Sequence, residues 1–89
     1  MVPPLITINI LGGAKKIVGT SSLMFNRSNA SISEILAFLQ ENAGESKILN
    51  VNNILIAING IESSALSGND TIAKTGDVIT IVSVVHGGI

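Results

Sequence analysis

Few residues of this sequence can do chemistry, and most of them lack the neighbours that catalysis needs. His86 is the only histidine, no cysteine is present, and no carboxylate lies close to His86 in sequence, so a metal site or an activated nucleophile has no partners. The serines include no G-x-S-x-G elbow, and Gly12-Gly13-Ala14-Lys15 lacks the Walker spacing of a phosphate-binding loop. The sequence therefore predicts a protein that is not itself an enzyme and that binds no metal or cofactor.

The pair Gly87-Gly88 is the remaining candidate for a chemical role. It directly follows a stretch rich in Val and Ile and is followed by Ile89. Glycine has no Cβ, so a chain that ends in glycine can enter a narrow channel. From Val84 to Gly88 an extended chain reaches about 13 to 16 Å. Frayed chain ends are also often glycine-rich, so the pair indicates a function only in combination with the elements that precede it.

Length and charge limit the possible functions further. The 89 residues suffice for one domain with a modest core, and five basic against six acidic residues leave no basic stripe for phosphates. Trp and Tyr are absent, so nucleobases have almost no stacking platform. No apolar run approaches the roughly 20 residues of a membrane span, and the start of the chain is unlike a signal peptide. We expect a cytoplasmic protein that binds neither nucleic acid nor membrane directly.

The first half of the chain predicts a hairpin followed by a helix. Residues 5–11 alternate as a strand with one buried face, Gly12-Gly13 indicates a turn, and residues 17–25 read as a second strand. Ser31 and Glu34 have the spacing of a capping box, which predicts a helix that stops at Gly44. An apolar stripe at helical spacing supports this helix: Ile32, Ile35, Leu36 and Leu39.

The second half predicts more strands. Residues 54–58 are continuously apolar, as in a central strand covered on one face, and Asn59-Gly60 indicates a tight turn. Leu66 and Ile72 are predicted core anchors, with loop residues 67–70 between them and another turn at 75–77. Residues 78–85 form the predicted last strand.

The predicted order is strand, strand, helix, strand, short strand, strand, without an internal repeat. This order favours an α+β fold in which one helix packs across a mixed sheet of four to five strands. We expect a single domain over residues 1–85 and a flexible C-terminal tail over residues 86–89.

With the order in place, several stretches resemble the ubiquitin-like β-grasp sulfur carriers over most of the chain. The resemblance rests on ILIAING, Leu66, TGDVITI and the terminal VVHGG. Asn59-Gly60 and Gly76-Asp77 are similar to the molybdopterin synthase small subunit, whereas Ser83 and the His86-Gly87-Gly88 ending are similar to the ubiquitin-related modifier. We favour the modifier.

The resemblance implies chemistry at Gly88. A ubiquitin-activating-type adenylyltransferase would use ATP to activate the Gly88 carboxylate, and a sulfurtransferase or thiolation enzyme would convert it to a thiocarboxylate. The family donates sulfur to tRNA or to a molybdopterin precursor. Family members end on the glycine, so we expect removal of Ile89 to produce the active form. Gly87 and His86 would then be recognised by the activating enzyme, although a solvated tail residue explains His86 equally well.

The last predicted strand suggests a docking surface. If Ile79 and Ile81 face the helix, Thr80, Val82 and Val84 lie on the open face of the sheet. An exposed apolar patch there would suit the activating enzyme, but valine also simply favours strands.

Two other functions remain open. The chain resembles a permanent small subunit that binds the molybdopterin synthase large subunit, or it is a β-grasp interaction module whose tail has no chemistry. Some members of the resembled family also attach to lysines of target proteins. The lysines of this chain are either conjugate acceptors or plain solubilising charges: Lys15, Lys16, Lys47 and Lys74.

Overall fold

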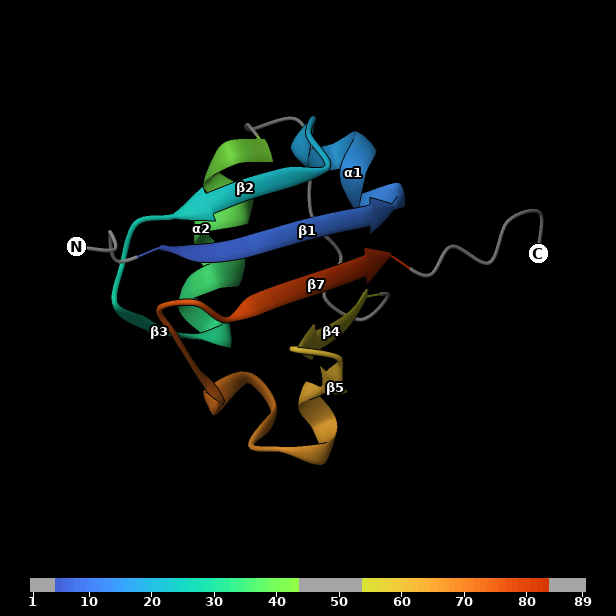
Figure 1. Cartoon of the computed structure of the whole chain (residues 1–89). Helices are drawn as coiled ribbons and strands as arrows, with labels where there is room; N and C mark the ends of the chain where they lie inside the picture. The colour runs from blue at the N-terminus through green and yellow to red at the C-terminus, as the bar shows by residue number, and fades with distance from the viewer. Residues whose placement is uncertain (1–4, 44–53, 84–89) are drawn as a thin grey trace.

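The computed structural model describes residues 5–43 and 54–83, which build a mixed five-stranded sheet with a helix across one face (Figure 1). The order in the sheet is β2-β1-β7-β4-β5. The strands are β1 (Ile6–Gly12), β2 (Ser22–Phe25), β4 (Ile54–Ile58), β5 (Ile61–Glu62) and β7 (Val78–Ser83). This is the predicted α+β fold.

The first and last strands pair at the centre of the sheet. β1 runs parallel to β7, whereas β1–β2, β4–β7 and β4–β5 are antiparallel. β7 is thus the middle strand, and β4 is the fourth of five rather than central. The predicted turn between β4 and β5 is present, with φ of 51° at Asn59 and 86° at Gly60.

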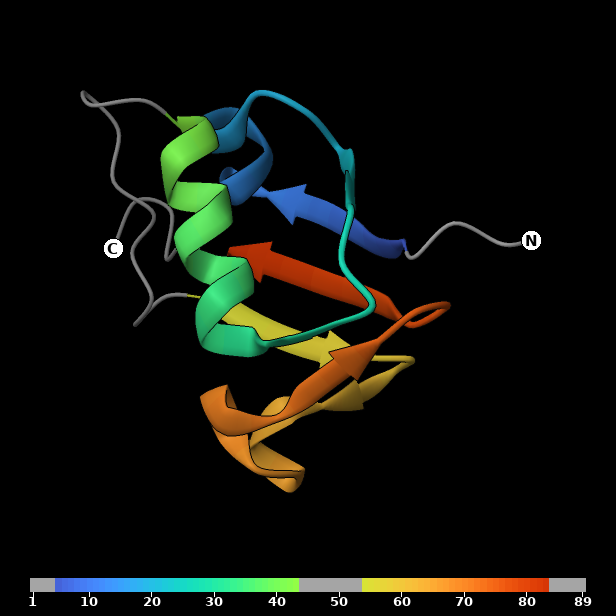
Figure 2. The ribbon, with the colours of Figure 1, turned by 90° about the vertical axis from the view of Figure 1, so that its left-hand side faces the viewer.

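Helix α2 (Ile32–Ala43) crosses one face of the sheet, as Figure 2 shows. Alternate residues of β1 and β7 point toward it and are fully buried: Ile6, Ile8, Ile10, Ile79 and Ile81. The predicted helix stripe meets them, with Ile32, Ile35, Leu36 and Leu39 all buried. Each such side chain contributes about 1.5–3 kcal/mol on burial, so this layer is the main source of stability. The predicted stop at Gly44 lies outside the described residues.

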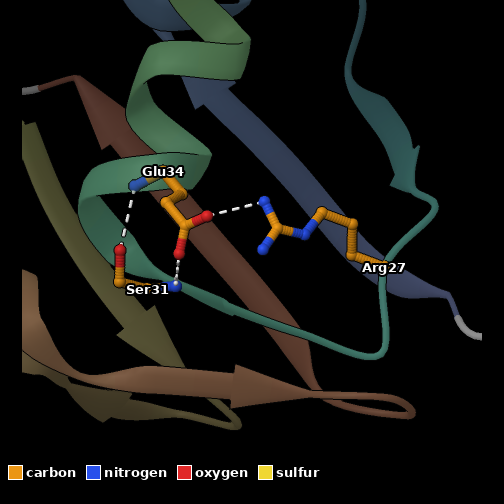
Figure 3. Close-up of polar contacts among 3 residues, drawn as sticks. All are labelled: Arg27, Ser31 and Glu34. Atoms are coloured by element: carbon orange, nitrogen blue, oxygen red, sulfur yellow. Dashed lines mark hydrogen bonds and ion pairs between the residues drawn. The ribbon is translucent and has the colours of Figure 1, made fainter.

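The capping box at the start of α2 is confirmed. The Ser31 N–H donates to Glu34 Oε1 and the Glu34 N–H donates to Ser31 Oγ, both at 3.1 Å. Arg27 Nη1 lies 2.6 Å from Glu34 Oε2, so the same carboxylate also forms an ion pair (Figure 3). The N–H of Ser31 and the Arg27 guanidinium hold the pKa of Glu34 below its ordinary value.

The second predicted strand is wrong over its first half. Residues Gly13–Val18 form a short helix, α1, and only Ser22–Phe25 form the strand. Ala14 and Val18, four residues apart on one face of α1, are both buried in the core. Gly19 then ends α1 with φ of 92°.

The two predicted anchors after β5 are also wrong. Leu66 is 46% exposed and Ile72 is 51% exposed. A second sheet pairs β3 (Asn29–Ser31) with β6 (Ile72–Lys74), and its register places Ala30 beside Ala73. Ala73, and not its neighbour Ile72, is the buried residue of β6. Strand alternation therefore turns Ile72 outward. Between β5 and β6 the chain forms two 3₁₀ turns, η2 (Ser63–Ala65) and η3 (Gly68–Asp70), and η3 lies in the predicted loop.

Candidate functional site

The predicted reactive tail lies outside the described residues. This applies to Val84, His86, Gly87, Gly88 and Ile89, and to the predicted domain boundary at residue 85. The structure does describe the strand that leads to them, because β7 ends at Ser83. Lys15 and Lys74 are exposed, whereas Lys47 and the side chain of Lys16 are not described.

A close approach between β1 and β7 fixes the end of β7. Ser83 pairs with Gly12 on one side and with Ile54 on the other. Gly12 has φ of 66° and ψ of −145°, and a Cβ added there would lie 2.9 Å from the carbonyl oxygen of Ser83. Only glycine allows this approach without strain. The last described residue is thus held in the middle of the sheet.

Side-chain hydrogen bonds fix the beginning of β7. Asn59 Nδ2 donates to Asp77 Oδ1 at 3.0 Å, and the Val78 N–H donates to Asn59 Oδ1 at 2.9 Å. The second carboxylate oxygen of Asp77 accepts the Lys74 N–H at 2.7 Å. Asn59 and Asp77 therefore join the β4–β5 turn to the turn that precedes β7, and both belong to motifs on which the family resemblance rests.

The open face of the sheet carries the predicted docking residues. Ile79 and Ile81 face the core, so Thr80 and Val82 point to the opposite face, where both are half-buried. No helix of the described residues covers that face (Figure 2). Their role in binding a partner stays a prediction.

An apolar row crosses this face beside the end of β7. In the sheet register Val82 stands between Leu11 and Leu55, which are 47% and 50% exposed. The next row on this face consists of Asn9, Thr80 and Ala57, so two of its three residues are polar. A hollow of about 250 Å³ opens next to Val82, and its lining is Leu55, Ile56, Ala57, Gly60, Glu62, Thr80 and Val82. The surface can receive an apolar side chain of a partner next to Ser83, the last described residue of β7.

Sequence reasoning missed Leu11 and Leu55, although a signal for both was present. In residues 5–11 the isoleucines occupy the even positions, so Leu11 is a large apolar residue on the solvent parity. Leu55 has the same status between Ile54 and Ile56. Only the register of β1, β7 and β4 shows that both residues flank Val82.

The described residues contain no group of three or more His, Cys, Asp or Glu side chains that could hold a metal ion. None of the helices within these residues is long and apolar enough to cross a membrane. Residues 5–43 and 54–83 thus form a folded body with an apolar surface next to Ser83, the last described residue of β7.

Comparison with known proteins agrees with this arrangement. The model of the ThiS family matches residues 8–88, which is nearly the whole chain and includes Gly87-Gly88. No curated protein matches the sequence at a significant level.

Solved structures with the same fold include three informative matches. The small archaeal modifier protein 1 of Methanosarcina acetivorans is 21% identical and superposes over 99% of this chain and 100% of its own, with a TM-score of 0.73. Urm1 of Trypanosoma brucei is 20% identical with the same coverage and TM-score. A complex of subunits 1 and 2 of the molybdopterin-converting factor from Helicobacter pylori matches at 24% identity, over 94% of this chain and 99% of its own, with a TM-score of 0.63.

Proposed function

Because the chain belongs to the ThiS family, we propose that it is a ubiquitin-like sulfur carrier and protein modifier with its reactive carboxylate on Gly88. The observation that carries this proposal is the extent of the family match, which runs through the glycine pair. The fold supports it, since β7, the middle strand of the sheet, is the described element that comes just before that pair in the sequence.

The proposed reaction takes place on a partner enzyme. A ubiquitin-activating-type adenylyltransferase binds ATP, the Gly88 carboxylate attacks the α-phosphate, and pyrophosphate leaves. Sulfur at the oxidation level of sulfide, delivered by a sulfurtransferase or thiolation enzyme, then attacks the acyl carbon of the adenylate, displaces AMP and leaves a thiocarboxylate on Gly88. The carrier contributes no catalytic group: it presents a chain end that is thin at Gly87 and Gly88, and its body binds the enzyme. Transfer of this sulfur to tRNA, with conjugation to target lysines as a second outlet, completes the proposal.

The reactive form in this scheme ends at Gly88. A peptide bond to Ile89 occupies the carboxyl group that must be adenylated, so hydrolysis of that bond has to come first. His86 and Gly87 then enter the adenylation site, where a side chain at residue 87 obstructs passage.

Mass spectrometry of the protein recovered from its native cell tests the proposal. We expect a chain that ends at Gly88, with part of it carrying sulfur in place of one carboxylate oxygen. In vitro, a chain ending at Gly88 and its cognate adenylyltransferase should release pyrophosphate from ATP, and Gly87→Val should reduce that release at least roughly tenfold, a loss of about 1.4 kcal/mol. Ser64→Val adds the same side chain at an exposed position of η2 and serves as the control.

Two results would contradict the proposal. A full-length chain that is adenylated as readily as the trimmed one would remove the need for processing. A native terminus without sulfur, together with an inert trimmed chain, would leave a β-grasp interaction module without tail chemistry.

One observation favours a second assignment, the small subunit of molybdopterin synthase. The two pairs that resemble that subunit, Asn59-Gly60 and Gly76-Asp77, are brought together by the bond between Asn59 and Asp77. In that case the thiocarboxylate passes its sulfur to a molybdopterin precursor within a stable complex. Copurification with a larger catalytic subunit separates this assignment from the free modifier.

A further inference from the structure

The β4–β5 turn places an asparagine directly before a glycine at the surface. Asn59 and Gly60 are both exposed and both have positive φ. This dipeptide is chemically vulnerable, because the nitrogen of the next residue can attack the asparagine side chain and glycine offers no Cβ to hinder the attack. Asparagine is accordingly one of the thermolabile residues of proteins.

The reaction needs only the two residues and water. The Gly60 nitrogen forms a bond to Cγ of Asn59, and the side-chain nitrogen leaves as ammonia together with the proton of the Gly60 N–H. Water then opens the resulting succinimide ring to aspartate or isoaspartate. No oxidant, reductant or cofactor takes part.

In the folded protein the Asn59 side chain is held away from this reaction. Its Nδ2 donates to Asp77 Oδ1 and its Oδ1 accepts the Val78 N–H, so both polar atoms of the amide are bonded to the segment that starts β7. Attack by the Gly60 nitrogen turns the planar Cγ into a tetrahedral centre, so the amide cannot keep both hydrogen bonds while it reacts. A slow reaction of this kind follows the population of the open turn.

We propose that Asn59 is a deamidation site whose reaction with Gly60 is held back by its hydrogen bond to Asp77. In the aspartate product a carboxylate oxygen stands where the Nδ2 donor stood, 3.0 Å from the Asp77 oxygen that accepted its hydrogen bond, and in isoaspartate Cγ has become part of the backbone, so neither product keeps the donor. Two acceptors of like charge then face each other, so the product cannot rebuild the bond. The modification therefore removes the side-chain bond between the β4–β5 turn and Asp77, and leaves the backbone bond from the Asn59 N–H to the Val78 carbonyl oxygen, 2.8 Å, as a remaining link between residue 59 and β7.

The test is a comparison of deamidation rates by peptide mass spectrometry during prolonged incubation at mildly alkaline pH and 37 °C. The samples are the full chain, the full chain unfolded in urea, and the variants Asp77→Ala and Asp77→Asn. We expect slow conversion of Asn59 in the folded chain and rapid conversion in urea. Asp77→Ala should accelerate it by about tenfold, the factor that corresponds to one lost hydrogen bond to a charged group. Asp77→Asn should accelerate it less, because its amide oxygen can still accept from Asn59 Nδ2 but carries no charge.

Asn69 serves as an internal control, because it is an exposed asparagine in a different turn, η3, and its rate should not respond to Asp77. Far-UV circular dichroism shows whether each variant is folded, and Asp77→Asn keeps the size of the side chain if Asp77→Ala is unstable. Equal rates in the folded and the urea-unfolded chain would overturn the proposal. So would folded variants that convert Asn59 no faster than the unchanged chain.

Discussion

At Gly12 a single residue decides how closely β1 and β7 approach. Its φ of 66° and ψ of −145° lie near a region that glycine alone occupies freely, and a Cβ would meet the Ser83 carbonyl oxygen at 2.9 Å. Sequence reasoning predicted a hairpin turn at Gly12-Gly13, which is wrong, since Gly12 is the last residue of β1 and Gly13 begins α1. That reasoning did not reveal the contact with Ser83, because that contact joins residues far apart in the sequence through the parallel register.

Replacing this glycine should therefore loosen the end of the sheet. We expect Gly12→Ala to lower the free energy of unfolding by about 1–3 kcal/mol, measured by urea denaturation. Gly19→Ala is the matched control, since Gly19 also has positive φ but has open space around its Cβ position. If Gly12→Ala loses no more stability than Gly19→Ala, the close approach to Ser83 is unimportant.

Among the elements, α2 was the most predictable, because its signals are local. The capping box and the stripe at helical spacing both lie within the helix and its first turn, and both are confirmed. The region of α1 misled the same reasoning. Its six residues are too few to establish a period, and Val18 lies at a position that fits a strand equally well.

The cap of α2 makes stability depend on pH. The Ser31 N–H and the Arg27 guanidinium favour ionised Glu34 and lower its pKa in the folded state, so the unfolded chain binds more protons at acidic pH. The stabilisation is present above the ordinary glutamate pKa of about 4.3 and is lost as the pH falls through the lowered folded value.

We expect Glu34→Gln to lose less stability than the unchanged chain between neutral pH and about pH 3, because glutamine keeps an acceptor for the cap but does not titrate. Urea denaturation at both pH values measures the difference. Glu41→Gln removes a carboxylate from the same helix outside the capping box and should lose stability on acidification like the unchanged chain. An acid loss in Glu34→Gln equal to that of Glu41→Gln would contradict this role of the cap.

In the whole molecule the two faces of the sheet differ: one forms the core and the other is an open surface. One face packs on α2 with fully buried isoleucines, and the other presents the row of Leu11, Val82 and Leu55. The fold class was predictable because the strand patterns indicated one sheet and the helical spacing of residues 32–39 indicated one helix to cover it. The apolar row was not, because alternation assigns a face to each strand separately and only the pairing of β1, β7 and β4 brings the three residues together.

This division predicts a variant that separates binding from folding. Val82→Asp should weaken binding of the adenylyltransferase by roughly tenfold or more, because it places a charge at the centre of the apolar row. It should cost about 1 kcal/mol of stability or less, since the side chain is not in the core. Calorimetric titration and urea denaturation measure the two effects.

Val78→Asp is the control for this variant: same residue type, same strand and same face, but at the other end of β7. Binding that falls equally in both variants would show that general charge rather than the row determines affinity. Unchanged binding in Val82→Asp would remove the row from the proposed function.

The parallel pairing of β1 with β7 also has a consequence for synthesis. The ribosome makes β1 first and β7 last among the described strands, and every other strand of the five-stranded sheet attaches through one of these two. The β1–β2 and β4–β5 pairs do not involve β7, but completion of the sheet must wait until β7 has emerged from the exit tunnel, because its pairs with β1 and β4 cannot form earlier. A polypeptide truncated by premature termination lacks the middle of its sheet, so quality-control proteases should remove it before it competes for partners.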